Sequence, residues 1–403
     1  MVVDSSKNKI EDSDGLTLSE IRRAIPAHCF RRSHMISFGY LARDILYVSA
    51  LVFGALQIPS IQNVVLRTLG WVVYGFLQGL VVTGIWILGH ECGHGAFSSK
   101  TTINDAVGWA LHSALLVPYF SWKITHARHH RYTGHMEKDT AFVPLTENEY
   151  AEAGGLQATD LADLMQDTPL KTLATLLRHQ LVGWQLYLFT YATGGERMIL
   201  RETGDNRRMP SHFDPYSPLF TRQQRFAIVL SDLGILIMVI ILSYVGMNIG
   251  FLNMCGLYFM PYLWVHHWLG ESWDIQTDYI PPLMYSLVAI TYLHHTHEAI
   301  PHYTASAWSF KKGALGTVDR SFGFIGRHFF HDIIDHHVVH HLFPKIPFYN
   351  AEEATAAIRP LLGNAYHERK QESFLLSLWT TFQECQYVSD NNSDTGSGVL
   401  WWN

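Results

Sequence analysis

Two long stretches without charge limit the fold of this chain more than any other feature. Residues 45–66 and residues 68–89 each hold 22 residues with no Asp, Glu, Lys or Arg. Arg67 separates the two stretches, and a turn around Pro59 and Ser60 interrupts the first. A helix needs about 20 mainly apolar residues to cross the hydrocarbon core of a bilayer. The sequence therefore predicts two membrane-spanning helices that follow each other closely.

A second apolar block predicts two more spans. Residues 226–270 contain Asp232 as their only carboxylate, Lys or Arg side chain, and they are too long for a single crossing. The turn-forming residues 246–250 divide the block into spans over 226–245 and 251–270. The predicted fold is an all-α integral membrane protein with four transmembrane helices in two hairpins.

Composition agrees with a membrane protein. Hydrophobic residues make up 48% of the chain and charged residues 16%, whereas soluble domains have roughly 25% charged residues. The apolar stretches 106–120 and 281–293 are too short to cross, so we expect interfacial helices or helices packed on the spans. The net charge of -6 comes without a basic block, which argues against a nucleic-acid partner.

The chain divides into three predicted parts. Residues 1–44 form a cytoplasmic N-terminal segment with a short amphipathic helix, which starts at a capping box from Thr17 to Glu20. This helix suits either a membrane surface or a solvated position. Residues 45–375 form a single membrane domain, and residues 376–403 form a tail that is partly disordered.

Eight of the 24 histidines fall into three short boxes. On a helix, residues three or four apart share a face, so each box presents its imidazoles together. Neutral imidazole is a common ligand for iron and zinc, and eight ligands exceed the three or four that one zinc ion takes from protein. The boxes therefore indicate two metal ions, with these candidate ligands: His90 and His94 in box one; His126, His129 and His130 in box two; His337, His340 and His341 in box three.

The four predicted spans place all three boxes on the same side of the membrane. Boxes one and two follow the second span and box three follows the fourth, so an even number of crossings separates them. All 29 Lys and Arg residues except Arg67 lie on that side too. The positive-inside rule makes it the cytoplasmic side, together with both termini.

Two other interpretations remain open at this stage. His90, Glu91 and His94 match the HExxH pattern of zinc proteases, in which the glutamate is the general base. That reaction would leave most of the box histidines without a role. A metal transporter fits less well, since ligands clustered on one membrane face offer no path across the bilayer.

Five segments of the chain resemble the acyl-lipid delta-12/omega-3 group of membrane fatty acid desaturases, in its fungal form. The segments are GHECGHGAFS (89–98), SALLVPYFSWKITHARHHRYTGHMEKDTAFVP (113–144), HTHEAIPHY (295–303), GALGTVDRSFGFIGRHFFHDIIDHHVVHHLFPKIPFYNAEEATAAI (313–358) and, near the N-terminus, IRRAIPAHCFRRS. The resemblance covers residues 17 to about 370.

The resemblance implies a di-iron centre, O2 as the oxidant and a cis double bond as the product. It implies a phospholipid-linked oleoyl chain as substrate and linoleoyl as product, in the endoplasmic reticulum membrane. A further histidine before box three completes the ligands in relatives, and the pattern favours His295, with His297 as the contender and His294 as a neighbour. The chain has no His-Pro-Gly-Gly haem motif, so electrons should come from cytochrome b5 and its NADH-dependent reductase.

Departures from the family pattern leave the reaction outcome open. Gly95, His336 and Val339 stand beside the boxes where relatives often carry other residues. Omega-3 (delta-15) or dual desaturation therefore remains an alternative to delta-12 desaturation, and hydroxylation on the same scaffold is another. Ligand histidines usually donate their second N–H to an oxygen acceptor, and five nearby acids are candidates for that role: Glu91, Asp139, Asp319, Asp332 and Asp335. Four more histidines are expected at an interface or the surface: His112, His179, His212 and His367.

Overall fold

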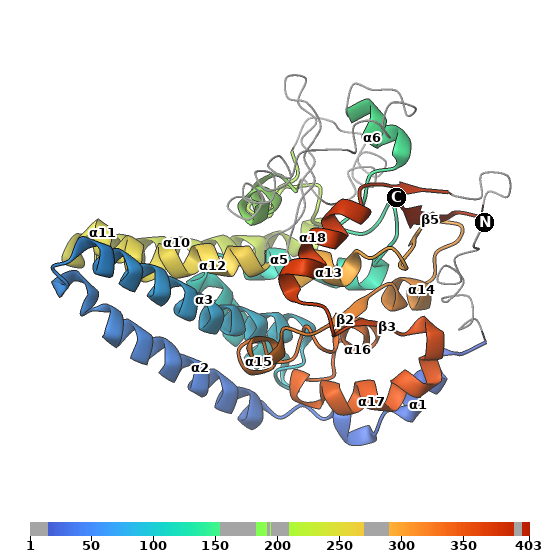
Figure 1. The fold of residues 1–403 in the computed structure, drawn as a ribbon, viewed down its shortest axis with the longest axis horizontal. Coiled ribbons are helices and arrows are strands. Elements are labelled where there is room, and N and C mark those ends of the chain that lie inside the picture. Colours follow the sequence, from blue (N-terminus) through green and yellow to red (C-terminus); the bar gives the residue numbers. More distant parts are fainter. Residues whose placement is uncertain (1–14, 154–182, 192–193, 195–208, 270–289, 391–396) are drawn as a thin grey trace.

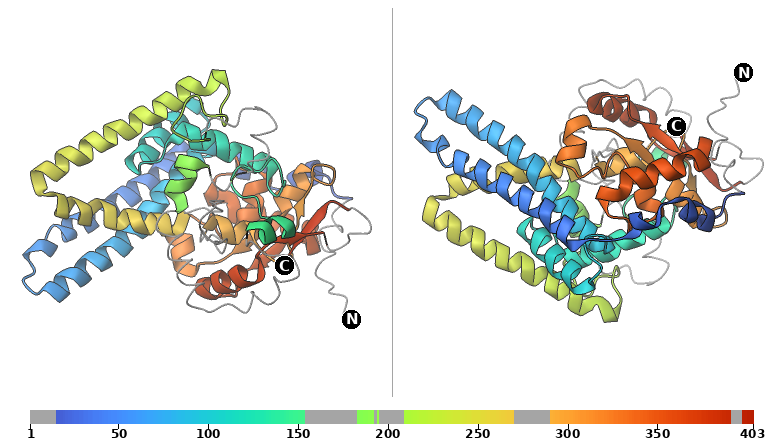
Figure 2. Two further views of the ribbon diagram at one scale, coloured as in Figure 1. Left: turned by 90° about the horizontal axis from the view of Figure 1, so that it is seen from above. Right: turned by 90° about the horizontal axis from the view of Figure 1, so that it is seen from below.

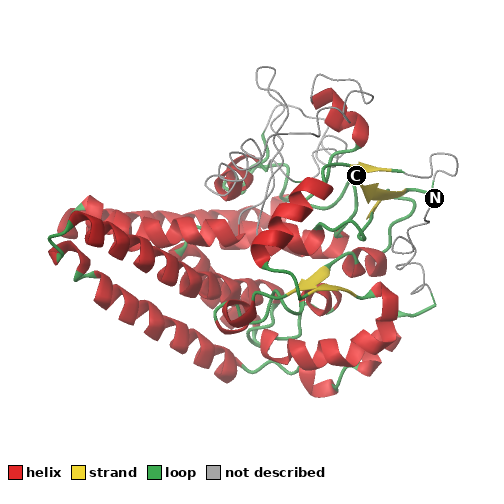
Figure 3. Ribbon diagram, in the orientation of Figure 1, coloured by secondary structure: helices red, strands yellow, loops and turns green. Residues whose placement is uncertain are grey.

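The computed structural model describes residues 15–153, 183–191, 194, 209–269, 290–390 and 397–403. It is mostly helical, with two small sheets (Figure 3). Long helices project together from one end, and shorter helices and the sheets form a cap at the other end (Figures 1 and 2). The long helical elements are α2 His34–Ala55, α3 Val64–His94, α10 Arg225–Ile249 and the run of α11 Phe251–Met254, a π-turn Cys255–Phe259 and α12 Met260–Leu269.

The cap consists of short elements. Its helices are α1 Leu18–Ala24, α4 Thr101–Ala114, α5 Tyr119–Tyr132, α6 Glu147–Ala153, α13 Ile290–His295, α14 Phe310–Leu315, α15 Gly323–His328, α16 His337–Leu342, α17 Ala351–Leu362 and α18 Phe374–Glu384. Short 3₁₀ turns occur at Ala27–Phe30, Ile58–Ser60, Arg222–Gln224, Phe348–Asn350 and Gly363–Ala365. The strands are β1 His302–Tyr303, β2 Val318–Arg320, β3 His367–Arg369, β4 Val388–Ser389 and β5 Val399–Trp402.

Three of the described helical segments are long and apolar enough to cross a membrane. They cover His34–Ser60, Val64–His94 and Arg222–Ile249. The first begins earlier than the predicted span 45–66. Arg43 and Asp44 bond each other there, with Arg43 Nη2 2.8 Å from Asp44 Oδ1, so the helix continues through both charges.

The fourth predicted span, 251–270, is helical as far as Leu269 but is interrupted by the π-turn. Pro261 has no N–H to bond the Leu257 carbonyl one turn earlier. The Tyr74 hydroxyl of α3 donates to that carbonyl at 2.9 Å instead. A backbone acceptor freed by proline is thus satisfied by a neighbouring helix, which is the arrangement that lipid surroundings demand.

The cap contains two sheets that an all-α prediction misses. β4 and β1 pair antiparallel with β5, and β2 pairs parallel with β3. These strands have two to four residues, too few for an alternating pattern to stand out in sequence. The tail from residue 376 contributes most of α18 and both β4 and β5, and Trp402 is buried. Residues 391–396 of the tail that is predicted to be partly disordered lie outside the described residues.

The N-terminal helix packs on protein. The predicted capping box is confirmed, since Glu20 N donates to Thr17 Oγ1 and Thr17 N donates to Glu20 Oε2. Ile21 and Ile25 are buried in a core shared with α16 and α17. The apolar side of α1 therefore contacts protein, which leaves it unavailable for insertion into a membrane surface.

The other short apolar stretches differ in outcome. Residues 106–120 fall on α4 and the start of α5, and α4 packs against α3 and α10. Gly89 of α3 makes that approach possible, because a Cβ there would lie 2.3 Å from the His112 ring. Most of the stretch 281–293 lies outside the described residues.

Candidate metal centre

The structure brings all nine predicted ligands together where α3, α5, α13 and α16 meet. They form two adjoining sets. The first group consists of His90, His94, His126, His130 and His340, whose nearest nitrogens all lie within 4.8 Å of one another. The second group contains His129, His295 and His341, and His337 joins it.

Each box owes its geometry to a helix end. Box one occupies the last turn of α3, which stops at Gly95 in the left-handed conformation (φ 71°). Box two lies in the last two turns of α5. His126 and His130, four residues apart on α5, lie in the first group, and His129 lies in the second. One helix thus supplies both groups.

Three of the four imidazoles in the second group have an N–H group held by an oxygen acceptor, and His295 Nδ1 has no hydrogen-bond partner among the described residues. His129 Nδ1 lies 2.7 Å from Asp139 Oδ1, and His337 Nδ1 lies 3.3 Å from the Ile333 carbonyl. Thr133 Oγ1 donates to the His129 carbonyl and also lies 3.1 Å from His341 Nδ1. Because that hydroxyl proton is already used, His341 Nδ1 must be the donor. All three rings therefore carry their proton on Nδ1.

The Nε2 atoms of these three rings then carry lone pairs, and the lone pairs of His337 and His341 face each other. His337 Nε2 lies 3.1 Å from His341 Nε2 and 3.3 Å from His295 Nε2. His129 Nε2 lies 3.3 Å from His295 Nε2. Lone pairs at such distances repel unless a cation lies between them. The donor set thus fits a metal ion that prefers neutral nitrogen ligands, such as iron.

The first group is held by helices and aromatic rings. His126 stacks on Trp122 with ring centroids 4.4 Å apart, and Trp86 lies parallel to His90 at 5.8 Å. His90 Nε2 lies 3.2 Å from His94 Nε2, as does His126 Nε2 from His130 Nε2. The two groups touch where His130 stacks on His341, with centroids 4.0 Å apart.

Burial keeps these imidazoles neutral. It is the largest cause lowering the pKa well below the ordinary value of histidine, and neighbouring imidazoles lower it further. A neutral ring has a free lone pair at neutral pH, as a metal ligand requires. The shift applies to His126, His130, His295, His337, His340 and His341.

The structure distinguishes the three histidines that precede box three. His295, at the end of α13, faces the second group. His297 Nδ1 accepts from Ala299 N, and its Nε2 accepts from Arg369 at 2.9 Å, so both its nitrogens are engaged elsewhere. His294 bonds the Ile334 carbonyl at 3.0 Å and stands beside His337, as expected of a neighbour.

Buried Arg320 of β2 fixes the end of α13. Its Nε donates to the Leu293 carbonyl at 2.7 Å, and its Nη2 donates to the Thr296 carbonyl at 3.4 Å. Burial lowers the pKa of Arg320 to about 10, so it remains charged at neutral pH. These two bonds orient the turn that carries His295, a role that sequence alone did not reveal.

Of the five acids expected to support the ligands, Asp139 is seen bonded to a box imidazole. It also accepts from the Gly134 and Ala141 N–H groups. Asp319 instead accepts from Val338 N at 2.8 Å, in the first turn of α16, and from the Tyr366 hydroxyl. It holds box three through the backbone.

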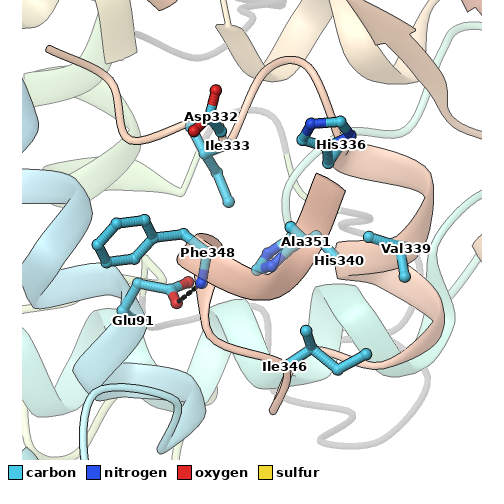
Figure 4. A pocket seen from close by; sticks show the side chains of 9 residues that line it. All are labelled: Glu91, Asp332, Ile333, His336, Val339, His340, Ile346, Phe348 and Ala351. Atoms are coloured by element: carbon cyan, nitrogen blue, oxygen red, sulfur yellow. Dashed lines mark hydrogen bonds between the residues drawn. The ribbon is translucent and has the colours of Figure 1, made fainter. Parts of the chain in front are cut away.

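Glu91 does not have the position of the general base of a zinc protease. Its Oε2 accepts from Phe348 N at 3.1 Å, beside a pocket behind His340 that has space for about one water molecule (Figure 4). The pocket also borders Asp332 and His336. The first group contains five histidines, rather than the two of the HExxH pattern. The zinc-protease interpretation is therefore wrong.

Histidines outside the boxes are more buried than predicted. His112 and His212 are fully buried, and His112 Nε2 lies 3.1 Å from the Trp86 carbonyl. Burial lowers the pKa of each to about 3. His367 is also buried, in β3, and His179 lies outside the described residues. The prediction of an interface or surface position was wrong for the three described residues, because a hydrogen-bonded imidazole packs readily in a core.

Comparison with known proteins agrees with this site. The family model for fatty acid desaturases matches residues 69–373. An oleate hydroxylase of Claviceps purpurea is 42% identical over 96% of this chain and 80% of its own length. A delta-12 fatty acid desaturase of Mortierella isabellina is 42% identical over 93% of this chain and 88% of its own. A delta-12 oleate desaturase of Trichosanthes kirilowii is 38% identical over 96% and 95%, respectively. The resemblance seen in the sequence is confirmed: this chain belongs to the fatty acid desaturase family.

Proposed function

We propose that this chain is a delta-12 desaturase that converts a phospholipid-linked oleoyl chain to linoleoyl with O2. The observation that carries the proposal is the pair of adjoining histidine groups, which have the donor set for two iron ions. Delta-12 desaturases are among relatives that align with more than nine-tenths of this chain.

The proposed ligands of one iron are His90, His94, His126, His130 and His340, and those of the other are His129, His295, His337 and His341. A bound iron pair supplies the power to take hydrogen from an unactivated methylene, which no side-chain acid or base can do. The protein orients three imidazoles of the second group through their Nδ1–H bonds, and it packs buried tryptophan rings against His90 and His126 of the first group. The same packing keeps water away from the reacting carbons.

The membrane arrangement belongs to the same proposal. We infer four spans, with α11 and α12 forming the last, and with the histidine groups and both termini on the cytoplasmic side of the endoplasmic reticulum. Tyr74 satisfying the Leu257 carbonyl supports a lipid-embedded fourth span. The electron donor is a cytoplasmic carrier, for which we propose cytochrome b5 with its NADH-dependent reductase.

Hydroxylation is the second candidate function. The Claviceps purpurea oleate hydroxylase is as similar to this chain as the Mortierella isabellina desaturase is. Both outcomes begin by removing hydrogen from the same region of an oleoyl chain, so identity alone does not separate them. Omega-3 desaturation, alone or combined with delta-12, is a variant of the proposed reaction.

Expression in a yeast that makes oleate but no linoleate tests the proposal. We expect linoleate in the phospholipids, identified by gas chromatography and mass spectrometry. Appearance of a triply unsaturated acid would add omega-3 activity. A hydroxy acid without linoleate would overturn the assignment in favour of hydroxylation. An inactive variant, His94→Ala, at equal protein level provides the baseline.

A further inference from the structure

A short series of contacts connects the second histidine group to the protein surface beside α14. Thr133 Oγ1 lies 3.1 Å from His341 Nδ1. The Thr133 carbonyl accepts from the Trp308 indole N–H at 3.0 Å. Trp308 is partly exposed. One residue, Thr133, therefore separates a metal-site imidazole from an aromatic ring that reaches solvent.

The local backbone fixes this series in place. Tyr303 N donates to the Gly134 carbonyl and Met136 N donates to the Tyr303 carbonyl, so residues 132–138 are clamped to β1. Gly313 lets α14 approach closely, because a Cβ there would lie 2.2 Å from the Thr133 carbonyl and 2.9 Å from the Trp308 indole nitrogen.

The surface around Trp308 is aromatic and mainly basic. We define the Trp308 surface as Tyr132, Lys138, Trp308 and Lys312, which are exposed or partly exposed, and the buried His135 ring packs against Trp308. The Trp308 ring lies 5.5 Å from the Tyr132 ring and 5.4 Å from the His135 ring. Lys138 Nζ lies 5.4 Å from the Tyr132 ring, and Lys312 Nζ lies 5.9 Å from the Tyr303 ring.

The charges next to this surface leave it positive. Arg131 is exposed, and Lys311 bonds the Leu16 carbonyl. Among the described residues, the nearby acids are Glu137 and Asp390, which are partly exposed, and Asp139, which is buried against His129; Asp390 accepts from Ser397. Aromatic anchors with basic neighbours are typical of protein interfaces that recruit an acidic partner.

Its position favours a water-soluble partner. α14 lies at the end of the molecule opposite the turn between α10 and α11 (Figure 1). That turn belongs to the projecting helices that are proposed to cross the membrane. The Trp308 surface therefore faces away from the lipid.

We infer that a small, acidic one-electron carrier protein docks on the Trp308 surface and delivers electrons through Trp308 and Thr133 to His341. This inference rests on the proposed function, because each double bond consumes two electrons in addition to those of the two C–H bonds. Each docking event oxidises one carrier by one electron and reduces the metal centre by one. Two events supply a turnover, and two protons from water complete the conversion of O2 to two water molecules.

Charge reversal tests the docking step. The probe is the soluble haem domain of cytochrome b5, and the variants are the double substitution Lys138→Glu/Lys312→Glu and the control Lys100→Glu, which lies before α4. We expect the double variant to bind the haem domain roughly tenfold or more weakly at low ionic strength. The control should bind like the wild type, and added salt should weaken wild-type binding. Equal affinity of the double variant and the wild type would overturn the inference.

Trp308→Leu tests the electron path separately from docking. Because Trp308 is also an aromatic anchor of the surface, each protein is assayed at a saturating concentration of the haem domain. Under that condition we expect the variant to reoxidise the reduced haem several-fold more slowly than the wild type, followed by haem absorbance. Dithionite should still drive desaturation at the wild-type rate in both the leucine and the double variant. Unchanged haem reoxidation in Trp308→Leu would contradict the path. Absence of dithionite-driven product in the wild type would contradict the proposed function instead. The binding assay would still show whether the haem domain docks on the Trp308 surface.

Discussion

The two histidine groups are built from the same residue type but are held in different ways. In the second group, Asp139, Thr133 and the Ile333 carbonyl each accept an imidazole N–H, which fixes ring orientation and tautomer. In the first group, the His90 and His130 Nδ1 atoms have no hydrogen-bond partner among the described residues. In this group Trp86 packs on His90 and Trp122 stacks on His126.

The difference teaches that a metal site can be preorganised either by hydrogen bonds or by helix packing. Box one ends a 31-residue helix whose last turns are buried, so its positions are rigid without further support. Box three lies on a helix of six residues, α16, which is too short to be rigid alone. It depends on Asp319 for its first turn and on Thr133 for the ring of His341.

Removing one ligand from either group should have the largest effect. His94→Ala and His129→Ala should each lower desaturation more than about a hundredfold, since each ligand contributes to holding a metal. His297→Ala is the matched control, because His297 bonds Arg369 outside the groups, and it should stay within a few-fold of the wild type. Product is measured by fatty acid analysis at equal protein level. Full activity of either ligand variant would show that its group is not required.

Replacing the Asp139 carboxylate, which supports the second group, should reduce iron binding and activity less than removing a ligand. Asp139→Asn weakens the acceptor for His129 Nδ1–H, and such changes reduce metal affinity or activity by roughly 10- to 100-fold. Glu91→Gln is the counterpart in the first group. It should change little, because Glu91 Oε2 accepts from the Phe348 backbone, and Glu91 Oε1, at 3.7 Å from His90 Nδ1, is beyond hydrogen-bond distance. Iron content after dialysis against a chelator measures both. Equal losses in the two variants would remove the contrast between the groups.

Acid should destabilise the metal-free protein. The pKa of His112 and of His212 is lowered to about 3 by burial, whereas the unfolded chain has a histidine pKa near 6.5. Protons therefore bind the unfolded state preferentially as pH falls below about 6.5, and folding stability present above that pH is lost. Thermal unfolding of metal-free protein should occur at a lower temperature at pH 5.5 than at pH 7.5. A melting temperature that stays constant or rises in acid would contradict this burial.

Loosening the support of α16 should have the smallest effect. Tyr366→Phe removes one donor to Asp319, which still accepts from Val338 N. A lost buried hydrogen bond costs roughly 1–3 kcal/mol. We expect a lower melting temperature with near-normal iron content, measured by thermal unfolding and metal analysis. A loss of iron comparable to that of Asp139→Asn would contradict this expectation. It would mean that the bond from Val338 N to Asp319 cannot hold α16 without the Tyr366 hydroxyl.

Residue spacing predicted the site well because metal ligation requires local clustering. Boxes two and three, with their i, i+3 and i, i+4 spacing, lie on the helices α5 and α16, as predicted. The division of box two between two groups could not be read from spacing, since it depends on how α5 lies against α3 and α13. Arg320, Asp319 and Thr133 act through backbone or single side-chain contacts with distant residues, and such contacts leave no periodic pattern.

The long helices were predicted from the absence of charge, and the same criterion misplaced the first one. α2 begins at His34 after the N-cap Ser33, and it continues through Asp44 because Arg43 and His331 bond that carboxylate, His331 Nε2 at 2.9 Å. A charge that finds its partner inside the fold does not end a helix. The short strands escaped prediction because β2 and β3, or β1 and β5, come from segments far apart in the chain.

Metal content of the purified, active enzyme tests the central claim most directly. If the two adjoining histidine groups each hold an ion, plasma mass spectrometry should find two iron atoms per chain, and His94→Ala or His129→Ala should reduce that number. A single metal ion per chain in fully active wild-type protein would contradict the account.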